Sequence, residues 1–132
     1  MRIFIDTSAF YALLDRDDAN HPRARVAWTS MLEGTNSFFT SNYVLVESHA
    51  LLQHRLGIDA VRGYHEDIVP LIHIEFVAPE VHRSGMGALL SASRRNLSFV
   101  DCVSFEVMRS LGIKTVFAFD PHFEEQGFTL IP

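Results

Sequence analysis

The chain has 132 residues, of which 48% are hydrophobic and 20% charged, and its formal net charge is −5. This length fits one domain that buries its own core, and the composition argues against a collagen-like, coiled-coil or disordered chain. No apolar run reaches the roughly 20 residues of a membrane span, and the N-terminus does not have the pattern of a signal peptide. The acidic balance disfavours a protein that coats nucleic acid through a basic surface. Cys102 is the single cysteine, which predicts a reducing, cytoplasmic location. Together these features predict one soluble domain over residues 1–132.

Apolar runs and helical patterns alternate along the chain. The sequence predicts a strand over 2–5, helices over 7–14 and 21–32, a strand over 37–40, helices over 43–56 and 59–69, a strand over 71–77, helices over 79–95 and 99–111, and strands over 115–119 and 128–131. The expected N-caps are Thr7 or Ser8, Ser41 or Asn42, and Ser98. Several strands are apolar runs without alternation, which is typical of parallel strands covered on both faces. We predict an α/β fold, a three-layer α/β/α sandwich with a central, mostly parallel five-stranded sheet.

Four of the acidic residues directly follow apolar stretches, where an isolated ionised carboxylate is costly unless a cation or hydrogen bonds compensate it. They are Asp6, Glu47, Asp101 and Asp120. Asp6 and Asp120 stand at the carboxyl ends of predicted strands, the edge at which open parallel sheets bind ligands. Asp101 and Glu47 lie near the starts of predicted helices, so all four can reach that edge. Glu47 also has apolar neighbours one helical turn away, which predicts a side chain that points at the core.

A cluster of carboxylate oxygens without a nearby histidine or thiolate suits Mg²⁺ or Mn²⁺ rather than Zn²⁺. Such an ion binds a phosphodiester oxygen, activates a water and stabilises the leaving oxygen. A separate structural explanation stays open for each acid: a helix N-cap, a buried hydrogen-bonded glutamate, a first-turn aspartate and a turn aspartate. His122 follows Asp120 closely, and it is either a turn residue or a contact to a substrate phosphate.

Four segments resemble the PIN-domain family, in particular the VapC-type ribonuclease toxins. They are IFIDTSAFYALLDRDDANH at the start, TSNYVLVES in the middle, and then LSFVDCVSFEVMRSLGI and VFAFDPHFEEQGF. The four acids match, residue by residue, the positions of the metal-site acids of that family. The resemblance implies that Asp6 and Asp101 are the main ligands of Mg²⁺ or Mn²⁺. It implies that Glu47 and Asp120 also ligate the ion or orient the attacking water.

The resemblance also implies supporting residues, products and partners. Thr7 and Ser8 fall in the turn where such proteins orient the first aspartate and a bound water. The implied products carry 5′-phosphate and 3′-hydroxyl ends. The implied partners are an RNA substrate, a cognate antitoxin protein that places a basic residue against the acids, and a second copy of the chain in a homodimer. Ala118 departs from the family pattern, since many relatives have Thr or Ser at that position.

We predict a divalent-metal-dependent endoribonuclease, the toxin of a type II toxin–antitoxin pair. Two alternatives stay open: a PIN-type RNA-processing nuclease without an antitoxin, and a non-catalytic module that binds a cation, RNA or the arginines of a partner. Metal-dependent turnover of RNA separates a nuclease from a binding module. A short neighbouring gene for a DNA-binding antitoxin separates a toxin from a processing nuclease.

Overall fold

The computed structural model describes residues 1–132, and its strands form one five-stranded sheet. The strands are β1 (Arg2–Ile5), β2 (Ser37–Ser41), β3 (Ile72–Glu75), β4 (Thr115–Phe117) and β5 (Thr129–Ile131). Every neighbouring pair is parallel, and the order across the sheet is β3-β2-β1-β4-β5. The predicted five-stranded α/β architecture is confirmed, with a sheet that is parallel throughout.

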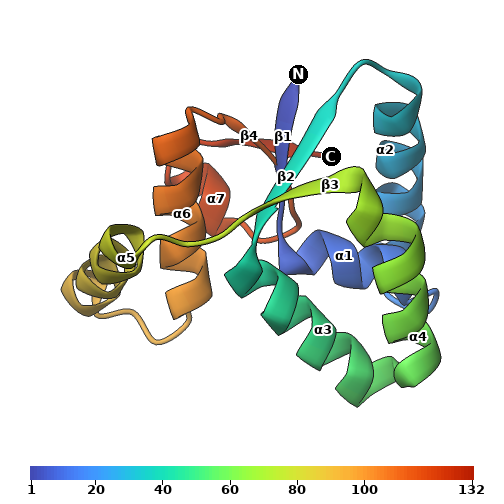
Figure 1. Ribbon diagram of the computed structural model, residues 1–132, viewed down its shortest axis with the longest axis horizontal. Coiled ribbons are helices and arrows are strands. Elements are labelled where there is room, and N and C mark those ends of the chain that lie inside the picture. The colour runs from blue at the N-terminus through green and yellow to red at the C-terminus, as the bar shows by residue number, and fades with distance from the viewer.

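Helices cover both faces of this sheet. They are α1 (Thr7–Leu14), α2 (His21–Glu33), α3 (Asn42–Leu56), α4 (Ile58–Gly63), α5 (Pro79–Ala92), α6 (Phe99–Leu111) and α7 (His122–Glu125), with a π-helical turn η1 (Tyr64–Ile68) and a 3₁₀ turn η2 (Val69–Leu71) after α4. Figure 1 shows α1, α2 and α4 on one side of the strands, α6 and α7 on the other, and α5 outside α6. None of these helices has the length and hydropathy of a membrane span.

The central strand β1 shows how the apolar runs specify the sheet. Ile3, Phe4 and Ile5 are fully buried because helices pack on both faces of the strand. Val116 and Phe117 in the neighbouring strand β4 are fully buried for the same reason. Burying each such side chain stabilises the fold by about 1.5–3 kcal/mol. Asp6 therefore directly follows a strand that is buried on both faces.

Some helices end at the predicted residues and others do not. α3 and α6 end at Gly57 and Gly112, whose φ angles of 95° and 68° suit glycine. The predicted helix over 79–95 is too long, because the chain turns at Ser93, whose φ is 51°. The predicted helix over 59–69 is wrong in its second half, where Pro70 has no backbone N–H to continue an α-helix and the chain forms η1 and η2 instead.

Two of the predicted strands are also shorter than expected. β3 covers Ile72–Glu75 rather than 71–77, since the Val77 N–H donates to the Asn42 side-chain oxygen (2.8 Å) instead of a neighbouring strand. β4 stops at Phe117 rather than residue 119, because the Phe119 N–H donates to the Ser8 hydroxyl (2.9 Å). Both changes occur at the carboxyl edge of the sheet, where the chain leaves the ladder to build the site described below.

The contact between α5 and α6 gives a first testable prediction. A Cβ at Gly85 would lie 2.6 Å from Val103 Cγ2 and 3.2 Å from the Val103 backbone, whereas a Cβ at Gly87 would meet nothing within 4 Å. We expect Gly85→Ala to destabilise the protein by about 1–3 kcal/mol through overpacking. Gly87→Ala should stabilise it by about 0.5–1 kcal/mol, because alanine favours a helix. Urea unfolding of the two variants measures both effects, and equal effects would contradict the close α5–α6 approach.

Candidate active site

The loops that follow β1 and β4 bring Asp6 and Asp120 to the carboxyl edge of the sheet. Asp6 directly follows β1, and its backbone N–H donates to the Phe117 carbonyl of β4 (3.1 Å). The Thr40 hydroxyl donates to the Ile5 carbonyl (2.8 Å) and fastens the end of β2 to the same point. Three strand ends are therefore tied together around Asp6, as the position of an acid after a buried parallel strand predicts.

Asp6 is the N-cap of α1, which corrects the prediction that Thr7 or Ser8 has that role. Its Oδ2 accepts hydrogen bonds from the Ser8 N–H (3.1 Å) and the Ser8 hydroxyl (2.7 Å). The same hydroxyl accepts from the Phe119 N–H, so Ser8 joins the start of α1 to the loop after β4. Oδ1 has no hydrogen-bond partner in the chain, which leaves one oxygen of the Asp6 carboxylate available to a ligand.

Burial sets the charge state of Asp6, which is only 4% exposed. The pKa of Asp6 is raised from its usual 3.8 to about 7: desolvation is the largest cause, the charges of Asp101 and Asp120 also raise it, and the two hydrogen bonds from Ser8 lower it. A carboxylate with so raised a pKa is strained when ionised. A cation beside Oδ1 would relieve that strain.

Asp101 stands in the first turn of α6 in a capping box. The Ser98 hydroxyl accepts from the Asp101 N–H (3.0 Å), and Asp101 Oδ2 accepts from the Ser98 N–H (3.1 Å). Burial raises the pKa of Asp101, its hydrogen bonds with Ser98 lower it, and the charges of Asp120 and Glu47 raise it. Asp101 thus combines a local capping role with a position that faces the other acids.

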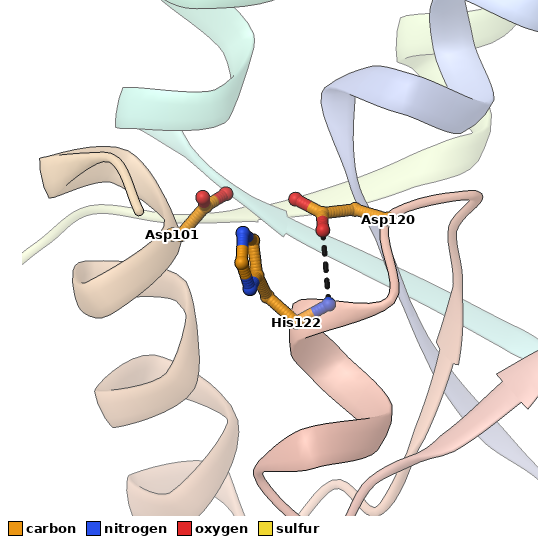
Figure 2. A group of neighbouring side chains, drawn as sticks. All are labelled: Asp101, Asp120 and His122. Atoms are coloured by element: carbon orange, nitrogen blue, oxygen red, sulfur yellow. Dashed lines mark hydrogen bonds between the residues drawn. The ribbon is translucent and has the colours of Figure 1, made fainter. Parts of the chain in front are cut away.

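Asp120 and His122 lie opposite Asp101, from the loop after β4 and the start of α7. Asp120 Oδ1 accepts from the His122 N–H (2.9 Å), and Figure 2 shows the imidazole ring directed at the Asp101 carboxylate. Potential metal-ligand atoms of Asp101, Asp120 and His122 all lie within 4.8 Å of one another. The expectation of a cluster without a nearby histidine is therefore wrong. The error has its origin in tertiary structure. The short helix α7 was not predicted, and it turns the His122 ring toward Asp101 and Asp120.

The ring of His122 is already occupied by hydrogen-bond partners. Nδ1 lies 3.3 Å from Glu125 Oε2, and Nε2 lies 3.1 Å from the Asn96 carbonyl. Burial by itself lowers the pKa of His122, but the Glu125 hydrogen bond, the Asp120 charge and the Asn96 carbonyl together raise it. The Arg94 guanidinium also lies 3.4 Å from Nδ1, so each ring nitrogen already has a partner in the chain and the ring is not free to ligate an ion. The carboxylates are left as the ligands for an ion.

Glu47 and Thr7 complete the set of predicted residues. Glu47 lies on α3 and is half-buried at the site edge, not directed into the core as its apolar neighbours predicted. Its charge contributes to the raised pKa of Asp101, so it belongs to the same cluster. The Thr7 hydroxyl accepts from the Ser48 hydroxyl (3.1 Å), which joins the residue after Asp6 to the residue after Glu47. Asp6 and Glu47 stand outside the 4.8 Å group but interact electrostatically with its members.

The largest groove of the molecule is elsewhere. It has a volume of about 870 Å³ between α3, α4 and η1, and apolar side chains such as Leu45, Val46 and Ile58 line it. None of the four acids borders it. Size alone would select this groove, but the carboxylates with raised pKa values, Asp6 and Asp101, lie at the edge of the sheet, which makes that edge the candidate site.

Oxygen donors of this kind suit a hard divalent cation such as Mg²⁺ or Mn²⁺. The fold and the site together define an α/β/α protein with a cluster of acids at the carboxyl edge of a parallel sheet. A protein-family model described as PIN domain matches residues 3–128, and the chain therefore belongs to the PIN-domain family.

Individual relatives agree with this assignment. The chain is 36% identical over 127 residues to the 23S rRNA-specific endonuclease VapC20 of Mycobacterium tuberculosis, over 96% of this chain and 95% of the relative. The crystal structure of VapC20, described as a sarcin-ricin loop cleaving toxin, matches with a TM-score of 0.86 at 34% identity over 96% of each chain.

Two more distant structures share the fold. VapBC2 from Rickettsia felis, bound to a DNA fragment from its promoter, has a TM-score of 0.73 at 10% identity over 98% of this chain and 97% of that chain. FitAcB from Neisseria gonorrhoeae has a TM-score of 0.69 at 15% identity over 100% of this chain and 97% of that chain. At these identities the likeness concerns the fold alone.

The Ser8 bridge gives a second prediction. Ser8→Ala removes the side-chain hydrogen bond that lowers the pKa of Asp6, keeps the backbone one, and leaves the Phe119 N–H without a partner. We expect a loss of about 1–3 kcal/mol in the free energy of unfolding. The pKa of Asp6 should rise in this variant, so protons compete with Mn²⁺ for the carboxylate up to a higher pH. We therefore expect weaker Mn²⁺ binding at pH 7 that recovers at higher pH. Calorimetric titrations between pH 6 and 9 measure this shift.

Ser84→Ala is the matched control, since Ser84 is exposed on α5. An unchanged pH dependence of Mn²⁺ binding in Ser8→Ala would contradict the link between Ser8 and Asp6.

Proposed function

We propose that the chain is a Mg²⁺- or Mn²⁺-dependent endoribonuclease of the toxin type, in which residues 1–132 act as one nuclease domain. The observation that carries the proposal is the buried Asp6 carboxylate, with a free oxygen, in the field of Asp101 and Asp120. Relatives described as RNA endonucleases support the reaction class. The number of carboxylates fits a divalent ion better than a monovalent one.

The proposed roles follow from the position of each side chain. A divalent cation supplies Lewis-acid chemistry: it activates a water for attack on the phosphodiester and stabilises the leaving oxygen. Asp6 and Asp101 would hold the ion, with Asp120 as a further ligand. Glu47, half-buried at the edge, would orient the attacking water. Ser8 favours the ionised form of Asp6 and orients it through its two hydrogen bonds.

The remaining polar residues of the site act through the ligands. The Thr7–Ser48 hydrogen bond fixes α1 against α3, so Asp6 and Glu47 keep their relative position. The raised pKa of His122 favours its protonated form, which would offset part of the negative charge near Asp101 and Asp120 before an ion binds. The products implied by water attack in this family carry 5′-phosphate and 3′-hydroxyl ends.

For the substrate we propose ribosomal RNA, with the sarcin-ricin loop as the first candidate. The support is the identity of 36% over nearly the whole chain to a 23S rRNA-specific endonuclease. Loops are suitable substrates because their unpaired bases and exposed backbone are accessible to a protein.

The test is cleavage of an RNA hairpin with the sarcin-ricin loop sequence by the purified chain. We expect cleavage with Mg²⁺ or Mn²⁺ and none with EDTA, and recovery when Mn²⁺ is added in excess of EDTA. A hairpin with the same stem and a scrambled loop is the control. Binding without cleavage in every metal would favour a non-catalytic module, and cleavage in EDTA would exclude the metal mechanism.

The proposed partners are a cognate antitoxin and a second copy of the chain. The antitoxin proposal rests on the likeness to VapC20, which is described as a toxin. Co-expression with the product of a short neighbouring gene should suppress cleavage and yield a stable complex. Light scattering of the chain alone tests the homodimer. A cytoplasmic location fits the single, buried, unpaired Cys102.

A further inference from the structure

Three aromatic rings from three helices meet beside the acids. Tyr43 of α3, His82 of α5 and Phe99 of α6 have ring centroids 5.0–6.0 Å apart, and His82 stands edge-on to both other rings. Such distances and angles are those that aromatic rings prefer when they contact one another. We call these residues the aromatic trio.

Two members of the aromatic trio come from the same helices as acids of the candidate active site. Tyr43 precedes Glu47 by four residues on α3, so both side chains lie on the same face of that helix. Phe99 precedes Asp101 by two residues in the first turn of α6. The third ring reaches this place because the Asn42 side chain binds the Val77 N–H and fixes the segment that leads into α5. A nucleotide next to a phosphate held by the acids would therefore lie near the trio.

The hydrogen bond within the trio gives His82 a definite chemistry. The Tyr43 hydroxyl is bonded to His82 Nδ1. When the hydroxyl donates, Nδ1 is the acceptor, and the ring hydrogen must be on Nε2. Nε2 has no partner in the chain, and His82 is exposed. The trio thus offers solvent an aromatic ring and one fixed N–H donor.

Packing between helices does not explain this arrangement. α5 is already held against α6 by the close contact of Gly85 with Val103. An exposed histidine adds little to an apolar contact, for which leucine or phenylalanine would suffice. A net charge of −5 disfavours RNA binding through a broad basic surface, which gives contacts to bases a larger share of the affinity.

We propose that the aromatic trio is a binding site for one unpaired nucleobase of the RNA, which stacks on the exposed ring of His82, while the in-plane Nε2 edge of the ring is left for a neighbouring phosphate or sugar oxygen. This inference rests on the proposed ribonuclease function and adds the part of the substrate next to the cleaved phosphate. Unpaired RNA bases are recognised in this way, by stacking on aromatic side chains. Stacking on one aromatic side chain changes the affinity by about 5-fold to 150-fold.

The test uses the full chain with Asp101→Asn, so that the RNA stays intact in Mg²⁺. The probe is the sarcin-ricin hairpin with 2-aminopurine at one loop purine at a time, whose fluorescence falls when the base stacks. We expect a fall for at least one position, and His82→Ala should abolish it and weaken binding by about 5-fold or more. His82→Phe should retain the fall in fluorescence, because the ring remains. His54→Ala, an exposed histidine at the other end of α3, should behave as the parent.

The outcomes separate this inference from the proposed function. No fluorescence change at any position, or an unchanged affinity in His82→Ala, would overturn the base site and leave the trio as a packing contact or a surface for a protein partner. Cleavage of the unmodified hairpin by the wild-type chain is measured in parallel. If the chain cleaves and no base stacks, this inference fails alone; if a base stacks and nothing is cleaved, the base site stands and the nuclease proposal fails.

Discussion

RNA cleavage by Asp6→Asn should fall by more than about 100-fold, which exceeds the 10–100-fold cost of losing a group that merely supports a metal ligand. Asparagine keeps the shape of the side chain and an oxygen that accepts from Ser8, so the start of α1 is preserved. The substitution removes the negative charge that an ion needs at the most buried of the four acids. Initial rates on the sarcin-ricin hairpin over a series of Mn²⁺ concentrations measure the effect.

The Mn²⁺ series also shows which step is lost. If Asp6 holds the ion, excess Mn²⁺ should restore part of the rate. Asp17→Asn is the control, because Asp17 is an exposed acid in the turn after α1, and it should cleave like the wild type. Cleavage by Asp6→Asn at the wild-type rate would place the chemistry elsewhere.

The sequence predicted the sheet well because its signals are local. An apolar run such as Ile3–Ile5 has no alternation, so it requires a strand covered on both faces. The sequence indicates Thr7 or Ser8 as the cap of α1 and also leaves an N-cap role open for Asp6, without deciding between them. The Ser8 hydroxyl has a partner 111 residues away, the Phe119 N–H, which leaves Asp6 as the cap.

In the candidate site, too, local sequence signals predict some residues, while contacts between distant residues place the others. The position of Asp6 follows from the end of the first strand, and that of Asp101 from the start of a helix, and the sequence shows both. The place of His122 depends on the carbonyl of Asn96, which is 26 residues away and comes from the loop before α6. The aromatic trio likewise joins three helices through contacts between distant residues, so the pattern of one segment gives no signal for it.

Asp101→Asn should melt at a higher temperature than the wild type in EDTA, gain less from Mn²⁺, and lose RNA cleavage. Burial raises the pKa of Asp101, and raises that of Asp6 from 3.8 to about 7. The folded state therefore binds more protons than the unfolded chain over this range, and the free energy of unfolding falls as the pH rises from about 4 to about 7. Above pH 7 the ionised acids repel one another, and removing one charge relieves that repulsion.

Asparagine at position 101 also keeps an oxygen that accepts from the Ser98 N–H, so the capping box is not lost with the charge. Each kcal/mol gained should raise the melting temperature by about 3–5 °C for a chain of this size. For the wild type, Mn²⁺ at 100 times its Kd should add about 2.7 kcal/mol. Thermal melts of both proteins at pH 7.5, with EDTA and with Mn²⁺, measure these differences.

Asp59→Asn is the matched control for these melts, because Asp59 is an exposed acid in the first turn of α4. It loses a favourable interaction with the helix dipole, which should lower its free energy of unfolding by about 0.3–1 kcal/mol. It should therefore melt slightly below the wild type and keep the full gain from Mn²⁺. If Asp101→Asn instead melts well below the wild type in EDTA, the Asp101 charge stabilises the helix start more than it strains the cluster. That result would contradict the predicted strain among the acids and with it the shared ion site.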